Sequence, residues 1–327
     1  MVLPQERYRH LRGPAVTAIL GAGAFGAALA VTLSGTQPVT LWGRALQKGR
    51  EVARLPGVIL PAGVTLTDDL GLALDGQDRV ILALPAQALR GFLADHANLL
   101  DGRWLINTAK GIDLATGDSP STLIQAACPS ARIATLTGPS FAADIARGLP
   151  TALTLASTAE GVGALQHDLS TPVLRLYRSD DLRGAELGGA LKNVVAIAAG
   201  AAIGAGLGDS ARAALITRGF AEMVRLSVAL GARPATLAGL SGLGDLILTS
   251  TSDLSRNFRY GRALGAGQAF DSSLTVEGAA TACAATRLAA RHDIAMPIAE
   301  AVAGLAEGRA GVAETMETLM SRPLKEE

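Results

Sequence analysis

The first half of the chain alternates between short apolar runs and longer segments of helical character, several of them ended by Gly or Pro. Each run has the length and apolar content of a buried strand. Strand–helix alternation of this kind specifies a mostly parallel, doubly wound sheet. We therefore predict an α/β, Rossmann-like domain over residues 14–183. Its strands are expected at Ala15–Leu20, Pro38–Trp42, Arg79–Leu84, Arg103–Thr108, Arg132–Thr137, Thr151–Ala156 and Val173–Tyr177.

Strand signals stop after Leu182, and the second half reads as helices separated by Pro and Gly. An all-α C-terminal domain over residues 184–327 is the prediction. Its first helical runs are expected at Ala185–Ala205, Ser210–Leu230 and Pro234–Leu240.

The apolar run 186–208 carries Lys192 and Asn193 in its middle. A lysine is rarely buried unless it is paired or has a task. Gly188 and Gly189 lie one turn earlier on the same helix face, where each costs about 1 kcal/mol relative to alanine. Either a flat group lies on bare backbone beside the ammonium, or the glycines pack against a helix while the lysine reaches solvent. Residues 190–207 are long enough for a membrane span, but Lys192 and Asn193 favour a buried helix.

Composition narrows the class of protein. A chain of 327 residues with 49% hydrophobic content is comfortable for two cored domains. Its 29 basic and 29 acidic residues cancel, which argues against a nucleic-acid or membrane-surface partner. Cys128 and Cys283 are far apart and suit a reducing, cytoplasmic setting better than a disulfide framework. No histidine or cysteine has a neighbour at metal-ligand spacing, so we expect no metal.

A glycine fingerprint follows the first predicted strand. Gly21, Gly23 and Gly26 match G-x-G-x-x-G, and a helical segment comes next. The first glycine makes the turn, the second admits a pyrophosphate and the third packs helix on strand. Amides at the helix N-terminus then meet the phosphate charge. A dinucleotide site is the prediction, and a tight turn in an alanine-rich segment is the alternative.

The second predicted strand ends at Gly43-Arg44, where chains that bind NAD often have an acid. Arg44 suits a 2′-phosphate instead, by charge and by its bidentate fork. Asp68 and Asp69 lie too far along the chain to supply the missing acid. NADP use is therefore favoured over NAD, unless Arg44 is an ordinary exposed arginine.

Polar residues follow two further strands and recur in the helical half. Two of these segments, Lys110-Gly111 and Gly138-Pro139-Ser140, suit a phosphate or carboxylate at the carboxyl edge of the sheet. The alternative is that they are ordinary solvated loops. Asp245 lies among glycines and shares a helix face with Thr249. Ser255-Arg256-Asn257 places a fork-shaped cation between two hydrogen-bonding residues. Taken singly, Asp245 would be a helix cap and Arg256 a surface ion pair; taken together they indicate a site.

These segments resemble the bacterial soluble NAD(P)-dependent glycerol-3-phosphate dehydrogenase family. The matching stretches run in family order from Ile19 to Pro297, and the first 13 residues look like an extension. They are GAGAFGAALA, LWGR, NTAKGI, GPSFA, ELGGALKNV, ARAALITRGFAEM, GLSGLGDLILT, SRNFRYG, VEG and MPI.

The resemblance implies reversible reduction of dihydroxyacetone phosphate to sn-glycerol 3-phosphate, which supplies glycerophospholipid synthesis. It implies that Lys192 donates and accepts the proton, with Lys110 and Asp245 completing the catalytic surroundings. Implied substrate contacts are Lys110, Gly138, Ser140, Lys192, Asp245, Ser255, Arg256 and Asn257. Implied dinucleotide contacts are Gly21, Gly23, Ala24, Phe25, Gly26, Arg44, Lys110, Ala142, Arg256 and Glu277.

Two other functions stay open at this point. A non-catalytic NADP(H)-sensing regulatory protein would keep the glycine fingerprint without needing Lys192, Asp245 and Arg256. A related two-domain hydroxy-acid dehydrogenase would need a carboxylate clamp in place of a phosphate clamp. The direction of the pKa shift of Lys192 is also open, because burial and Lys110 would lower it whereas Asp245 would raise it. The expected partner is a small-molecule substrate, and a homodimer is the expected assembly.

Overall fold

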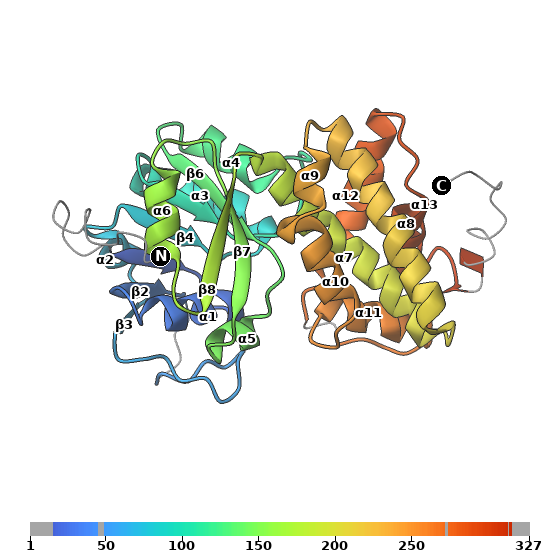
Figure 1. The fold of residues 1–327 in the computed structure, drawn as a ribbon, viewed down its shortest axis with the longest axis horizontal. Helices are drawn as coiled ribbons and strands as arrows, with labels where there is room; N and C mark the ends of the chain where they lie inside the picture. The colour runs from blue at the N-terminus through green and yellow to red at the C-terminus, as the bar shows by residue number, and fades with distance from the viewer. Residues whose placement is uncertain (1–15, 45–48, 272–273, 313, 316–327) are drawn as a thin grey trace, which may run out of the picture.

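A computed structural model describes residues 16–44, 49–271, 274–312 and 314–315. It consists of an α/β domain and a helical domain that lie side by side (Figure 1). The predicted fold class is confirmed, because a largely parallel Rossmann-like sheet is followed by helices alone throughout the described second half. The predicted N-terminal extension, residues 14–15 and residues 316–327 lie outside the described residues.

The sheet has eight strands in the order β3-β2-β1-β4-β5-β6-β7-β8. Neighbouring strands are parallel except for β6 and β7, so β7 and β8 run opposite to the others. One short strand, β3, was missing from the prediction. The strands are β1 (Thr17–Leu20), β2 (Val39–Trp42), β3 (Val64–Thr67), β4 (Arg79–Leu82), β5 (Trp104–Asn107), β6 (Arg132–Thr137), β7 (Thr151–Ala156) and β8 (Leu174–Ser179).

Helices cover both faces of this sheet, which explains why its inner strands are almost continuously buried, whereas the edge strands β3 and β8 are partly exposed. Successive strand residues point to opposite faces. Ile19 and Ile81 pack into one core with α1, α5 and α6, whereas Leu20 and Leu82 pack into another with α2, α3 and α4. The helices are α1 (Ala24–Leu33), α2 (Leu70–Leu74), α3 (Ala86–Leu100), α4 (Pro120–Ala127), α5 (Ala142–Ala146) and α6 (Val162–Leu169).

One long helix, α7 (Leu182–Gly204), forms the centre of the helical domain, and the other helices pack around it (Figure 1). Among the described helices it is the one with the length and hydropathy of a membrane span, but it is buried inside the protein. Being covered on every side accounts for its apolar composition all round. The remaining elements are α8 (Gly208–Ala229), α9 (Pro234–Leu237), a π-helical turn η1 (Leu240–Gly244), α10 (Asp245–Ser250), α11 (Arg256–Gly265), α12 (Glu277–Arg291) and α13 (Pro297–Ala306).

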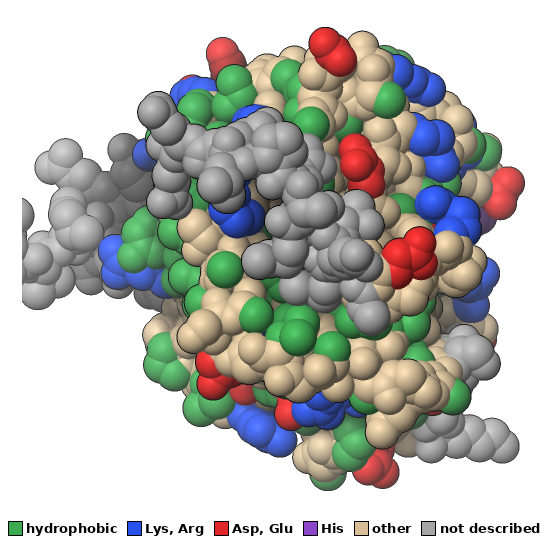
Figure 2. Space-filling model, turned by 90° about the vertical axis from the view of Figure 1, so that its right-hand side faces the viewer, with side chains coloured by type: hydrophobic (Ala, Val, Ile, Leu, Met, Phe, Trp, Pro, Cys, Tyr) green, Lys and Arg blue, Asp and Glu red, His purple; other side chains and the backbone are tan. Residues whose placement is uncertain are grey.

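Glycines let α7 and α11 cross at backbone contact. A Cβ on Gly200 would lie 2.1 Å from the carbonyl oxygen of Phe258, and one on Gly261 would lie 2.0 Å from that of Ile197. Gly204 and Gly265 repeat the arrangement one turn along. Each helix therefore uses a Gly-x-x-x-Gly face against the other. The face of the helical domain that points away from the sheet mixes Arg with Asp and Glu over its described part (Figure 2).

Candidate active site

The glycine fingerprint forms the turn between β1 and α1. Gly21 has a φ of +123°, and a Cβ there would lie 2.3 Å from the carbonyl oxygen of Ala83. A Cβ on Gly26 would lie 2.0 Å from the carbonyl oxygen of Gly21, so only glycine fits either position. Gly23 has open space where its Cβ would be, and no side chain caps the N-terminus of α1. Free amides beside open space fit a dinucleotide pyrophosphate.

The carboxyl ends of β2 and β3 meet beside this turn. Arg44 is exposed directly after β2. The register pairs Trp42 with Thr67, so Asp68 and Asp69 follow β3 alongside Gly43 and Arg44. The expectation that these acids lie too far away was wrong, because it rested on sequence distance and missed β3. Asp69 caps α2 by accepting from Leu72 N at 3.1 Å, and Asp68 is exposed.

Lys192 lies at the meeting point of the two domains. Its ammonium donates to Asp245 Oδ1 at 2.7 Å and to Thr249 Oγ1 at 2.6 Å. The other carboxylate oxygen, Asp245 Oδ2, accepts from Lys110 Nζ at 2.6 Å. Lys192 is 6% exposed and Asp245 is fully buried. Lys192 therefore does not reach for solvent, and one carboxylate joins two ammonium groups.

The glycines before Lys192 serve protein packing. A Cβ on Gly188 would lie 2.7 Å from the carbonyl oxygen of Ser241, in the turn that leads to Asp245. A Cβ on Gly189 would lie 2.7 Å from Thr137 Oγ1 at the end of β6. Protein atoms thus cover the bare backbone that one interpretation reserved for a flat group. The other interpretation was correct about the glycines and wrong about the lysine.

The buried position of Lys192 changes its acidity. Burial lowers the pKa of Lys192 to about 8, and the nearby Lys110 charge acts in the same direction. The carboxylates of Asp245 and Glu277 oppose the shift in pKa without cancelling it. This settles the direction that the sequence left open. An amine with such a pKa exchanges protons readily near neutral pH.

Lys110 reaches the site from the turn after β5. Its ammonium also donates to the carbonyl oxygen of Gly138 at 3.2 Å, and Ser140 Oγ donates to the same oxygen at 3.3 Å. Gly138, with a φ of +143°, follows β6 directly. Ala142 begins α5, which packs against α1. The loops after β5 and β6 therefore meet at the edge predicted to bind ligands.

The start of α11 faces the start of α12. Asn257 Oδ1 accepts from Gly278 N at 3.0 Å, which ties the two helix ends together. Ser255 caps α11, since its hydroxyl accepts from Phe258 N at 3.2 Å. The oxygens of Asn257 and Ser255 therefore have structural partners, and their predicted substrate contacts stay predictions.

Charged groups from both domains converge near this junction. Burial raises the pKa of Glu277, while the positive charges of Arg256, Lys110 and Lys192 counter the rise. Arg256 itself is exposed on the first turn of α11. The structure thus brings three cations from both domains into electrostatic range of Glu277, and such a group of cations suits a phosphorylated substrate.

Comparison with known proteins supports the same reading. A family model described as the N-terminus of NAD-dependent glycerol-3-phosphate dehydrogenase matches residues 16–162, and the model of its C-terminus matches residues 181–317. The chain belongs to the NAD-dependent glycerol-3-phosphate dehydrogenase family.

Named relatives of this glycerol-3-phosphate dehydrogenase chain match over nearly their whole length. A glycerol-3-phosphate dehydrogenase [NAD(P)+] of Paracoccus denitrificans is 63% identical, with 95% of this chain and 99% of the relative covered. One from Cereibacter sphaeroides is 64% identical over 94% of this chain and 99% of its own. A crystal structure of glycerol-3-phosphate dehydrogenase from Coxiella burnetii superimposes with a TM-score of 0.89 at 33% identity, covering 94% and 99%.

Sequence reasoning missed several residues around the dehydrogenase site. Glu186, Asn107 and Thr137 are buried close to Lys110 or to the helix that carries Lys192. An acid inside the apolar run of α7 was the available signal for Glu186, six residues before Lys192. Nothing in the sequence indicated that Asn107 would turn its amide towards that acid, because the two lie far apart along the chain.

Proposed function

We propose that the cluster of Lys192, Asp245 and Lys110 performs the proton transfer in the family's reaction. The enzyme is an NAD(P)-dependent oxidoreductase that reduces dihydroxyacetone phosphate to sn-glycerol 3-phosphate. The observation that carries the assignment is the buried ammonium of Lys192, held at 2.7 Å from a carboxylate and with its pKa lowered to about 8.

The proton and electron balance is simple. NAD(P)H, when bound, would supply a hydride to the ketone carbon, and the π electrons of the carbonyl would then move to its oxygen. Lys192 stabilises that developing negative charge and gives the oxygen one proton, which leaves a neutral amine. In the reverse direction the neutral amine takes the hydroxyl proton back.

Asp245 sets the charge of the site. With both lysines protonated, the two ammonium groups and one carboxylate sum to a single positive charge. An alkoxide forming beside them is neutralised, and few groups need to move because the carboxylate already fixes both amines. We propose that Lys110, Gly138 and Ser140 line the substrate position, with Arg256, Ser255 and Asn257 at its phosphate.

The cofactor assignment concerns first the use of NAD or NADP and then the preference between them. The family uses NAD or NADP, and we propose that this chain prefers NADP because Arg44 can pair with a 2′-phosphate. Gly21, Gly23, Ala24, Phe25 and Gly26 would hold the pyrophosphate at the start of α1. Ala142, Glu277, Lys110 and Arg256 would complete the cofactor site.

A substrate panel tests the proposed function. Oxidation of NADPH is followed with dihydroxyacetone phosphate, with unphosphorylated dihydroxyacetone and with a set of 2- and 3-keto acids. We expect turnover with dihydroxyacetone phosphate, poor turnover with dihydroxyacetone and none with the acids. Equal turnover of dihydroxyacetone and its phosphate would remove the phosphate site from the proposal.

We also propose that the enzyme is cytoplasmic, that the boundary between its two domains lies near Arg183, and that it assembles as a homodimer. Two free thiols, Cys128 and Cys283, are compatible with a reducing compartment. Light scattering combined with size-exclusion chromatography would measure the assembly.

A further inference from the structure

A buried carboxylate near the start of α7 links that helix to the α/β domain. Glu186 is 4% exposed. Its oxygens accept from Ser121 N at 3.0 Å, Ser121 Oγ at 2.6 Å and Thr135 Oγ1 at 2.9 Å. Burial raises the pKa of Glu186, and the hydrogen bonds from Ser121, Ser119 and Thr135 oppose that rise. Burying a carboxylate is costly unless it is hydrogen-bonded, and the contacts with Ser121 and Thr135 meet that requirement.

The amide of Asn107 connects this carboxylate to the backbone of Ala109, the residue before Lys110. Asn107 Nδ2 donates to Glu186 Oε1 at 3.4 Å and to the carbonyl oxygen of Ala109 at 3.3 Å. Asn107 Oδ1 accepts from Ala109 N at 2.9 Å. The side chain therefore brackets both backbone polar groups of the residue before Lys110. A flipped amide would set its oxygen against Glu186, so the carboxylate fixes which way the amide points.

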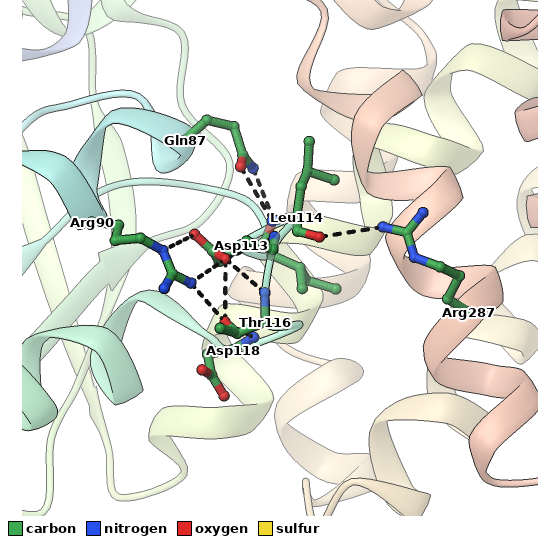
Figure 3. A network of polar contacts seen from close by, with 9 residues as sticks. Gln87, Arg90, Asp113, Leu114, Thr116, Asp118 and Arg287 are labelled. Atoms are coloured by element: carbon green, nitrogen blue, oxygen red, sulfur yellow. Dashed lines mark hydrogen bonds and ion pairs between the residues drawn. The ribbon is translucent and has the colours of Figure 1, made fainter.

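The far end of the same loop is held separately. Asp113 pairs with Arg90 and accepts from the backbone amides of Ala115 and Thr116, and Gln87 Nε2 donates to the carbonyl oxygen of Ile112 at 2.8 Å (Figure 3). Arg90 is largely exposed, whereas the anchor at Glu186 is buried. Lys110 thus extends from a turn that is fixed on both sides, with the buried anchor next to it.

We propose that Glu186, acting through Asn107, is a positioning residue for Lys110 and sets the distance from its ammonium to Asp245. This rests on the proposed function, in which Lys110 and Asp245 surround the reacting oxygen. The helix α7 carries Lys192 itself and fixes Lys110 through Glu186 and Asn107. One rigid helix therefore sets the positions of both ammonium groups. Displacing a reacting group by about 1 Å can cost up to a hundredfold in rate.

The test compares Glu186→Gln with a matched variant, Glu222→Gln. Glu222 is 3% exposed and accepts from Ile298 N at 2.9 Å and Ala299 N at 3.2 Å, so the chemical change and the burial are alike. We expect Glu186→Gln to lower kcat with dihydroxyacetone phosphate by about tenfold. Glu222→Gln should change kcat less than twofold per folded molecule, with the folded fraction measured by circular dichroism.

A double-mutant cycle separates positioning from a general structural effect. In a Lys110→Met background, Glu186→Gln should lower kcat by less than about twofold, because the residue it positions is gone. An equal loss in both backgrounds would overturn the inference and leave the proposed role of Lys110 intact. If Lys110→Met itself left kcat unchanged, the proposed role of Lys110 would fail as well.

Asn107→Ala covers the case in which Glu186→Gln does not fold. It removes the bracket around Ala109 while Glu186 keeps its bonds from Ser121 and Thr135. We expect the same loss of kcat, again suppressed by Lys110→Met. Normal turnover in Asn107→Ala would show that the amide does not carry the effect and would overturn the inference.

Discussion

At the scale of single residues, Asp245 decides what Lys192 can do. Its two oxygens bind ammonium groups from different domains, at 2.7 Å and 2.6 Å. Without the carboxylate, two positive charges would lie together in a buried space, and the pKa of Lys192 would fall further. With the carboxylate in place, enough of Lys192 stays protonated at neutral pH for it to act as an acid. The carboxylate is thus needed for protonation as well as for placement.

Replacing Lys192 tests the proton transfer. Lys192→Met should keep the fold and NADPH binding, since methionine retains the stem and much of the volume. Turnover should fall on the order of a hundredfold or more, as when a general acid is removed. Lys192→Arg should not restore it, because a guanidinium does not give up its proton. Single-turnover kinetics measure the rate of hydride transfer, and a cofactor titration measures NADPH binding. A near-normal rate of hydride transfer in Lys192→Met would contradict the mechanism.

The pH dependence should have opposite signs in the two directions. In the proposed mechanism Lys192 is protonated when the ketone is reduced and neutral when it accepts a proton from the alcohol, and its pKa is lowered to about 8. The kcat for reduction should therefore fall as pH rises through about 8, whereas the kcat for oxidation should rise over the same range. Profiles of both directions on one preparation provide the check. Two profiles with the same sign would rule out Lys192 as the group that titrates.

At the scale of elements, the sequence predicted strongly apolar segments well and partly polar ones poorly. The central helix and most strands were predicted because their apolar pattern extends over enough residues to be recognised. β3 was missed because Val64–Thr67 alternates apolar residues with threonines and is partly exposed at the sheet edge, whereas the other four-residue strands are nearly all buried. The predicted helix at Pro234–Leu240 ends at Leu237, and a π-helical turn follows to deliver Asp245. No local signal specifies such a turn.

The glycine crossing of α7 and α11 predicts opposite effects for two alanine substitutions. Gly261→Ala places a Cβ 2.0 Å from the carbonyl oxygen of Ile197, so the helices must separate. We expect the free energy of unfolding to fall by about 1–3 kcal/mol. Gly91→Ala, in the exposed middle of α3 with open space around it, should raise it by about 0.5–1 kcal/mol. Urea denaturation measures the free energy of unfolding of both variants. If the two substitutions changed it equally, the crossing of α7 and α11 would tolerate a methyl group.

The ends of β2 and β3 predict a change in cofactor preference. Arg44→Asp should remove the partner of a 2′-phosphate and supply an acceptor for a ribose hydroxyl. The ratio of kcat/KM for NADPH to that for NADH should fall by about tenfold or more. Arg54→Asp makes the same charge change at another exposed arginine and should leave the ratio nearly unaltered. An unchanged ratio in Arg44→Asp would mean that Arg44 does not contact the 2′ position.

At the scale of the whole molecule, each domain contributes a residue to the other. Ile112, on the loop after Lys110, is buried in the core of the helical domain. Glu186 of α7 is buried against β5, β6 and α4. The sequence indicated the individual members Lys110, Lys192 and Asp245, since each is an unusual residue in its local pattern. It did not indicate these exchanges, because they depend on which distant segments meet.

Ile112→Ala should weaken the coupling between domains. Trp42 and Trp104, the chain's two tryptophans, both belong to the α/β domain, so their fluorescence reports on that part. Circular dichroism at helix wavelengths reports on both domains. The two urea transitions should coincide in the wild type and separate in Ile112→Ala, which costs about 2–5 kcal/mol of core packing. The control is Ile106→Ala, because Ile106 belongs to the α/β core; it should shift both urea transitions to lower urea concentration together. If the two transitions were already separate in the wild type, the domains would not be coupled.

The continuity of α7 has a consequence for taking this protein apart. Domains are usually joined by an exposed linker, where proteases cut and where genes can be divided. Here the joint is a buried helix of 23 residues, about 35 Å long, which starts along β6 and ends at the crossing with α11. Every residue of this helix from Gly184 to Ala202 is buried, so limited proteolysis has no accessible site along that stretch. A fragment covering residues 184–327 would carry Glu186 away and leave Ser121, Thr135 and Asn107 without their acceptor, so neither half would be complete.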